Sequence, residues 1–156
     1  MRDDQEIFKV LQRHHVPFVV IGGHAVNYHG YGRTTEDVDI VWLRSPTAEQ
    51  SLHAALREID AAYIGNQIDP ATGIEQTLPV SLPFIQSTSL MMLVTRHGFL
   101  DLFDYVPGVP AENPGALLDS AVETGGLKYV SLGWLRRLKE VSGRPKDVID
   151  LQNLPE

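Results

Sequence analysis

The stretch from Phe18 to Val41 reads FVVIGGHAVNYHGYGRTTEDVDIV. It opens with the apolar run FVVI, whose length and β-branched content predict a buried strand. Gly22 and Gly23 follow directly, where the backbone can turn tightly and approach a ligand without a Cβ in the way. Residues 24–28 then predict a short helix. The two glycines would lie at its N-terminus, where free N–H groups and the helix dipole favour a phosphate.

A second strand is expected to start at Asp37, and Asp39 lies two residues further along it. Because alternate residues of a strand point to the same face, both carboxylates are expected to project together. Two carboxylates this close resist joint ionisation unless positive charge lies between them. Mg²⁺ prefers oxygen ligands and commonly takes one or two carboxylates together with substrate phosphates. The stretch therefore predicts a phosphate-binding site and a metal-binding site on adjacent elements.

The order of these features resembles the signature of the DNA polymerase β-like nucleotidyltransferase superfamily. The shared pattern is Gly22-Gly23, thirteen residues, and then Asp37-Val38-Asp39. The preceding apolar strand and the pair Arg33-Thr34 resemble the small single-domain bacterial members. The tail from Lys139 to Leu154, KEVSGRPKDVIDLQNL, resembles the closing helices of the minimal and abortive-infection toxin-type members. The resemblance covers residues 18–43, 97–103 and 127–154.

This resemblance implies a third carboxylate on a later strand, and the candidate is Asp101 in the segment HGFLDLF. Asp37, Asp39 and Asp101 would then hold two Mg²⁺ ions, and Asp101 could accept the proton of the acceptor hydroxyl. Asp104 is the nearby rival, but it is expected on the opposite face of the strand from Asp101.

Several residues are candidates for binding the triphosphate of a nucleotide. Backbone N–H groups of Gly22 and Gly23 would receive the β- and γ-phosphates. Lys139 and Lys146 would reach the triphosphate from the C-terminal helices, by similarity to the family's tail, although basic helix faces are often only solvated. Arg33 and Thr34 would steady the loop before the acids or contact phosphate, and Arg33 can equally pair with Glu36.

Length and composition limit what the chain can be. Its 156 residues, 43% hydrophobic and 21% charged, predict one domain over residues 1–156 with a substantial core. The absence of cysteine excludes disulfides and thiol catalysis. No apolar run reaches the length of a membrane span and no signal-peptide pattern opens the chain, so we expect a cytoplasmic protein without membrane partners. A net charge of −7 argues against a general nucleic-acid-binding surface, although five basic residues lie between residues 136 and 146.

The expected fold is α/β (α+β): a small mixed β-sheet with helices packed on one face and C-terminal helices closing the nucleotide cleft. Hydrophobic periodicity and turn residues predict helices at 4–13, at 46–59, at 132–141 and from residue 145 onward. Strands are predicted at 18–21, from residue 37, at 90–95, at 99–105 and at 127–130. Prolines and glycines leave residues 61–88 without clear periodicity, apart from an edge strand at 74–80 and a loop after it.

We therefore expect a Mg²⁺-dependent nucleotidyltransferase that moves a nucleoside monophosphate, AMP from ATP or its counterpart from another nucleoside triphosphate, to a hydroxyl of a small molecule, protein or tRNA. The acidic net charge favours a cationic small molecule or a protein hydroxyl over bulk RNA. A homo-oligomer or a partner chain would complete the acceptor site if this chain alone does not. The alternative is a non-catalytic module of a toxin–antitoxin or regulatory pair that binds a partner or nucleotide.

Overall fold

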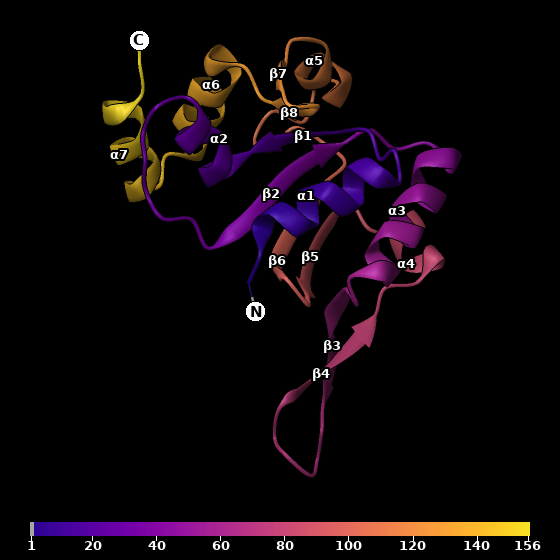
Figure 1. The fold of residues 1–156 in the computed structure, drawn as a ribbon. Helices are drawn as coiled ribbons and strands as arrows, with labels where there is room; N and C mark the ends of the chain where they lie inside the picture. The colour runs from indigo at the N-terminus through magenta and orange to yellow at the C-terminus, as the bar shows by residue number, and fades with distance from the viewer. Residues whose placement is uncertain (1) are drawn as a thin grey trace.

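The computed structural model describes residues 2–156, apart from the side chains of residues 66 and 67. One mixed sheet crosses these residues in the strand order β4-β3-β5-β6-β2-β1-β8-β7, with helices on both of its faces (Figure 1). The strands are β1 (Phe18–Ile21), β2 (Asp37–Trp42), β3 (Ala62–Ile68), β4 (Glu75–Pro79), β5 (Leu90–Thr95), β6 (Gly98–Phe103), β7 (Val122–Thr124) and β8 (Leu127–Tyr129). The helices are α1 (Asp4–Arg13), α2 (Gly22–Tyr28), α3 (Pro46–Glu58), α4 (Leu82–Ser87), α5 (Pro114–Asp119), α6 (Leu132–Ser142) and α7 (Pro145–Asn153).

The larger core lies between one face of the sheet and helices α1, α3 and α4. Helix α1 buries Ile7, Phe8, Val10 and Leu11, and α3 buries Leu52, Ala55 and Leu56, as the predicted apolar periodicity requires. These side chains pack on alternate residues of the central strands, which supply Val20, Val38, Ile40, Leu93, Leu100 and Leu102. This core confirms that helices cover one face of the sheet.

The second core lies on the opposite face, over β1 and β2. It joins Val19 and Val41 to residues of α2, α5 and α6, and α7 packs beside α6. Figure 1 shows α6 and α7 grouped with α2 at one end of this face, whereas β3 and β4 project from the other end as a hairpin. The C-terminal helices therefore stand beside the first turn of α2, where the sequence places the nucleotide cleft.

Local sequence signals explain where the C-terminal helices begin and end. Ser131 caps α6 by accepting a hydrogen bond from the N–H of Trp134. Gly143 ends α6 in the left-handed conformation, at a φ of 61°. Pro145 then opens α7, where its missing N–H costs no hydrogen bond.

The structure adds elements that the sequence pattern does not reveal. Strand β3 and helix α4 both lie in the region 61–88, and β7 precedes β8 at the sheet edge. Residues 82–87 were expected in a loop, but Ser81 caps them as a short helix whose Ile85 is buried. Helix α2 begins at Gly22 itself, so both glycines belong to its first turn. None of the helices within residues 2–156 combines the length and apolar character needed to cross a bilayer.

Candidate active site

Strand pairing brings the three predicted carboxylates onto one face of the sheet. Strands β2 and β6 run parallel, and their register sets Asp39 opposite Asp101 and Asp37 opposite Phe99. Directly paired residues, and residues two apart on one strand, share a face. Asp37, Asp39 and Asp101 therefore project together, although Asp101 lies more than sixty residues further along the chain.

Burial and neighbouring negative charge make Asp39 and Asp101 harder to ionise than isolated carboxyl groups, because both effects raise the pKa. Burial, followed by the negative charges of Asp39 and Asp37, raises the pKa of Asp101 to about 7. Burial also raises the pKa of Asp39, and the charge of Asp37 adds to the effect. Asp39 adds to the rise in the pKa of Asp101, whereas Asp101 partly opposes the rise in the pKa of Asp39. The cluster holds unbalanced negative charge that a bound cation would neutralise.

The donor set fits a hard divalent cation such as Mg²⁺, because carboxylate oxygens are its preferred protein ligands. Within residues 2–156, no three His, Cys, Asp or Glu side chains already converge tightly enough to hold a metal ion by themselves. This agrees with the usual magnesium site at a phosphate, in which one or two carboxylates act together with phosphate oxygens and water. The carboxylates thus supply part of a site that a phosphate-bearing ligand would complete.

Gly22 and Gly23 bring the backbone close to the carboxylates. Gly22 has a φ of 66°, and a Cβ at this position would collide with the carboxylate of Asp39. A Cβ on Gly23 would lie 2.5 Å from Oγ1 of Thr35. Neither position has room for a side chain.

A polar cavity of about 370 Å³ opens between this glycine pair, the loop before β2 and the C-terminal helices. Its lining residues are Gly22, Gly23, Arg33, Thr34, Thr35, Glu36, Asp37, Asp39, Lys139, Arg144 and Lys146. Every residue that the sequence singled out for this site lines the cavity except Asp101, which borders a second cavity together with Asp37. The chain therefore collects glycines, acids and bases around one space.

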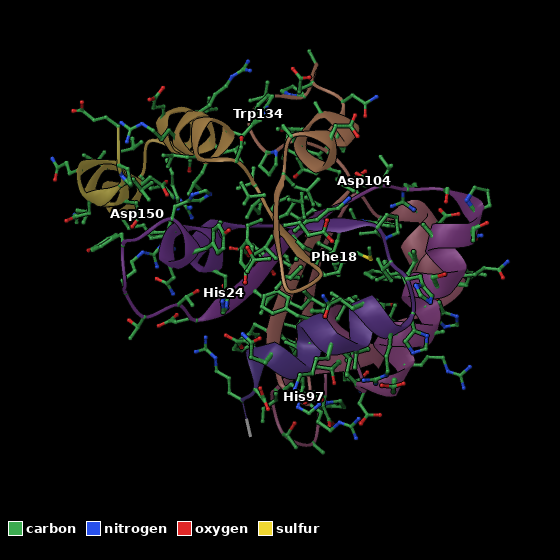
Figure 2. The ribbon with its side chains drawn as sticks, turned by 45° about the horizontal axis from the view of Figure 1, so that its top comes forward. Phe18, His24, His97, Asp104, Trp134 and Asp150 are labelled. Atoms are coloured by element: carbon green, nitrogen blue, oxygen red, sulfur yellow. The ribbon has the colours of Figure 1, made fainter. Side chains whose placement is uncertain are left out.

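The basic residues of the cavity fall into two groups, and the first is bound to carboxylates of α7. Lys139 is buried, and its Nζ lies 3.1 Å from Oδ1 of Asp147 and 2.9 Å from Oδ2 of Asp150. The Arg33 guanidinium donates to both oxygens of Asp150, at 2.7 and 2.9 Å. Figure 2 shows Asp150 on α7 facing the loop that leads into β2.

These contacts differ from the sequence-based interpretation. From the sequence, Arg33 could pair locally with Glu36. Instead, Arg33 and Asp150 meet across 117 residues of chain, because the C-terminal helix folds back onto the loop. Burial alone would raise the pKa of Asp150, but hydrogen bonds from Arg33 and Lys139 outweigh it and hold that pKa below its usual value.

The second basic group, Arg144 and Lys146, lines the cavity with exposed side chains. Lys146 is exposed and forms no ion pair within residues 2–156. Arg144 bonds to Asp147 at 2.8 Å, yet 59% of its side chain stays exposed. The sequence analysis did not place Arg144 in the site; the signal was its position one residue before Pro145, at the start of the last helix.

Two further side chains lie outside the cavity lining and have partners of their own. His24 is hydrogen-bonded at 2.9 Å to Asp4 of α1, and Figure 2 shows it beside the start of that helix. This contact joins α2 to α1. Asp104 accepts a hydrogen bond from Arg44 at 2.9 Å, so its carboxylate is already engaged by a different partner and does not replace Asp101.

No protein-family model and no curated protein sequence matches this chain. Its structure resembles that of a Thermotoga maritima protein classed as a nucleotidyltransferase, with 17% identity over 95% of this chain and 87% of the other, at a TM-score of 0.55. It also resembles the antibiotic-resistance factor ANT(2'')-Ia, with 12% identity over 96% of this chain and 78% of the other, at a TM-score of 0.54. At these identities the likeness concerns the fold, and the chain has a nucleotidyltransferase fold.

Proposed function

Starting from that fold, we propose that this chain is a Mg²⁺-dependent nucleotidyltransferase that transfers a nucleoside monophosphate from a triphosphate, ATP or another, to an acceptor hydroxyl. The observation that carries the proposal is the β2–β6 register, which sets Asp39 opposite Asp101 beside a cavity lined by two glycines and several bases. A module that only binds a partner would not need three carboxylates on one face of the sheet, where burial and the charges of Asp39 and Asp37 raise the pKa of Asp101. This arrangement therefore favours turnover over the binding-only alternative.

The polar cavity would receive the triphosphate. Gly22 and Gly23, in the first turn of α2, line this cavity, and their backbone N–H groups would donate to the phosphates. Arg144 and Lys146 would supply the positive charge for the β- and γ-phosphates. Lys139 and Arg33, already bound to buried carboxylates, would act by holding α7 and the loop before β2 in place.

The reacting atoms would lie at the carboxylates. Asp37 and Asp39 would hold two Mg²⁺ ions and Asp101 one of them, and the bound metal supplies positive charge to the α-phosphate and the leaving pyrophosphate. A bond forms between the acceptor oxygen and the α-phosphorus, and the bond between the α-phosphorus and the bridging oxygen breaks. The hydroxyl proton would pass to a carboxylate oxygen of Asp101, which borders the second cavity together with Asp37.

Calorimetric titration of ATP, CTP, GTP and UTP in the presence of Mg²⁺ tests this proposal. The comparison is between the wild type, the variant Asp37→Asn/Asp39→Asn, and a control, Asp60→Asn/Asp119→Asn, which removes two charges from exposed positions. We expect at least one triphosphate to bind the wild type and the control equally, and to bind the site variant about 100-fold more weakly. Absence of binding by all four, or equal binding by the site variant, would refute the proposal.

A further inference from the structure

The sheet face beyond the carboxylates changes abruptly from acidic to apolar. Strand β5 pairs with β6 so that Met92 lies opposite Asp101, and Val94 lies opposite Phe99. Since paired residues share a face, these apolar side chains continue the rows that begin with the acids on β2 and β6. The face that bears the catalytic candidates therefore extends sideways as an apolar surface.

This surface is open to solvent and hollowed. Met92 is 65% exposed, Ile64 60% and Phe99 56%. They border a cavity of about 300 Å³ whose lining is Asp37, Ile64, Met92, Leu93, Val94, Phe99 and Asp101. Among the side chains that the structure describes, no basic or amide group lines it. Apolar side chains are the usual lining of a ligand pocket, whereas isolated exposed ones need no explanation.

The apolar surface continues along the hairpin of β3 and β4. Ile64 pairs with Thr77 and Ile68 with Glu75, so Ile68 returns to the same face as Ile64 despite the bulge between them. Ile68 is 62% exposed. We call Met92, Phe99, Ile64 and Ile68 the apolar strip. It leads from Asp101 out along a hairpin that Figure 1 shows projecting from the body of the protein.

The hairpin also offers a backbone edge. Strand β4 ends the sheet order, and all five of its residues are exposed. Within residues 2–156 it pairs with β3 alone, so its outer backbone groups are open to another strand. An exposed sheet edge is a common place for an extended peptide to add, with side-chain pockets giving specificity.

We propose that the apolar strip binds the acceptor, and that the acceptor is an extended polypeptide segment that carries a hydroxyl side chain next to apolar ones. This inference rests on the proposed nucleotidyl transfer, since it places the hydroxyl at Asp101. The strip runs from the reacting carboxylates to a free strand edge, and an extended chain is the ligand that uses both.

Other acceptor classes fit the strip less well. RNA would bring phosphates to a surface whose charged lining, in the part of the chain that the structure describes, consists of Asp37 and Asp101, with no lysine or arginine among these residues to neutralise the phosphates. A polycationic sugar would leave the apolar side chains of Met92, Phe99 and Ile64 facing polar groups. An apolar peptide buries these side chains and leaves the carboxylates to its hydroxyl group.

The first arm of the test measures binding without turnover. Fluorescence anisotropy would follow a labelled peptide Val-Thr-Ile-Tyr-Val and a polar counterpart, Gln-Thr-Gln-Tyr-Gln, on the full chain without nucleotide. We expect the apolar peptide to bind about tenfold more tightly than the polar one. The variant Ile64→Ser/Met92→Ser should lose this preference. The control Val122→Ser/Ile149→Ser, which alters exposed apolar residues on β7 and α7, should keep it.

The second arm measures transfer of label from triphosphates labelled at the α-phosphate to the two peptides, to mixed tRNA and to kanamycin. Labelling of the apolar peptide, reduced about tenfold by Ile64→Ser/Met92→Ser, supports the inference. Labelling of tRNA or kanamycin but not of the peptide overturns it and leaves nucleotidyl transfer intact. Binding of a triphosphate without labelling of any acceptor also overturns it.

Two further results distinguish failure of the peptide-binding inference from failure of the proposed nucleotidyl transfer. If no triphosphate binds, nucleotidyl transfer fails, and the anisotropy arm still decides whether the strip is a peptide site. If light scattering shows a wild-type dimer that Ile64→Ser/Met92→Ser converts to a monomer, the strip is an interface between copies of the chain, and the inference is overturned.

Discussion

Neutralising Asp101 should stabilise the metal-free protein while removing its activity. The pKa of Asp101 is raised from 3.8 to about 7 by burial and by Asp39 and Asp37. A group whose folded-state pKa is raised contributes stability that is fully present below its unfolded pKa and is lost as the pH rises through the folded value. The Asp101→Asn variant carries no ionisable group at this position and does not lose this stability. Its free energy of unfolding should therefore equal that of the wild type near pH 4 and exceed it by the full amount above about pH 7.

The size of the effect follows from the pKa difference. A rise from 3.8 to about 7 corresponds to an upper limit of roughly 4 kcal/mol, at 1.36 kcal/mol for each pKa unit. The side chain is only half-buried and shares its interaction with Asp39, so solvent screening reduces the expected gain to about 1–2 kcal/mol. For a protein of this size that gain raises Tm by roughly 2–8 °C.

The assay is urea unfolding with a chelator present, at pH 5, 6, 7 and 8. Asp119→Asn, which removes a charge from an exposed helix end, serves as the control and should match the wild type at every pH. Adding Mg²⁺ with a bound triphosphate should stabilise the wild type more than Asp101→Asn, because the variant lacks a metal ligand. The reasoning is refuted if Asp101→Asn is no more stable than the wild type at pH 8, or if its advantage is independent of pH.

Two further predictions concern the basic groups of the cavity. Asp150→Ala leaves the Arg33 guanidinium without its carboxylate and the buried Lys139 with Asp147 alone, so the free energy of unfolding should fall by about 3–5 kcal/mol. Urea unfolding at pH 7 measures this, and a loss below about 1 kcal/mol would contradict a buried network. Since the pKa of Asp150 is lowered, the stability that this group contributes should be present above about pH 4 and lost as the pH falls further. Lys146→Ala should weaken triphosphate binding about tenfold with little change in stability, because this side chain is exposed and forms no ion pair within residues 2–156. Arg144→Ala should weaken binding to a similar extent but also lower the free energy of unfolding, because Arg144 donates to the buried carboxylate of Asp147. Titration calorimetry measures the binding, and unchanged Kd values would remove both residues from the site.

The part of the site that sequence could predict is the part built from local signals. An apolar strand, two glycines and alternating acids each act over a few residues, so Gly22, Gly23, Asp37 and Asp39 could be placed together from the pattern. Asp101 required the family resemblance as well, because only the β2–β6 register, and no local rule, sets it opposite Asp39.

The parts that sequence could not predict depend on contacts between distant segments. The bond between Arg33 and Asp150 exists only because α7 packs beside the loop before β2. Strand β3 carries Gly65 and a bulge, which break the alternation by which a strand is recognised. The apolar strip could not be predicted from the sequence either. Ile64 and Met92 lie on different strands, and only the order of the strands in the sheet brings them together.

The central claim is that the carboxylates of β2 and β6 form one metal-dependent site with a triphosphate. Counting bound Mn²⁺ by electron paramagnetic resonance, with a non-hydrolysable analogue of the triphosphate that binds, tests it most directly. The account predicts two tightly bound ions for each wild-type chain, as in a two-metal site, and one in Asp101→Asn. Equal numbers of ions in the wild type and in Asp101→Asn would contradict it.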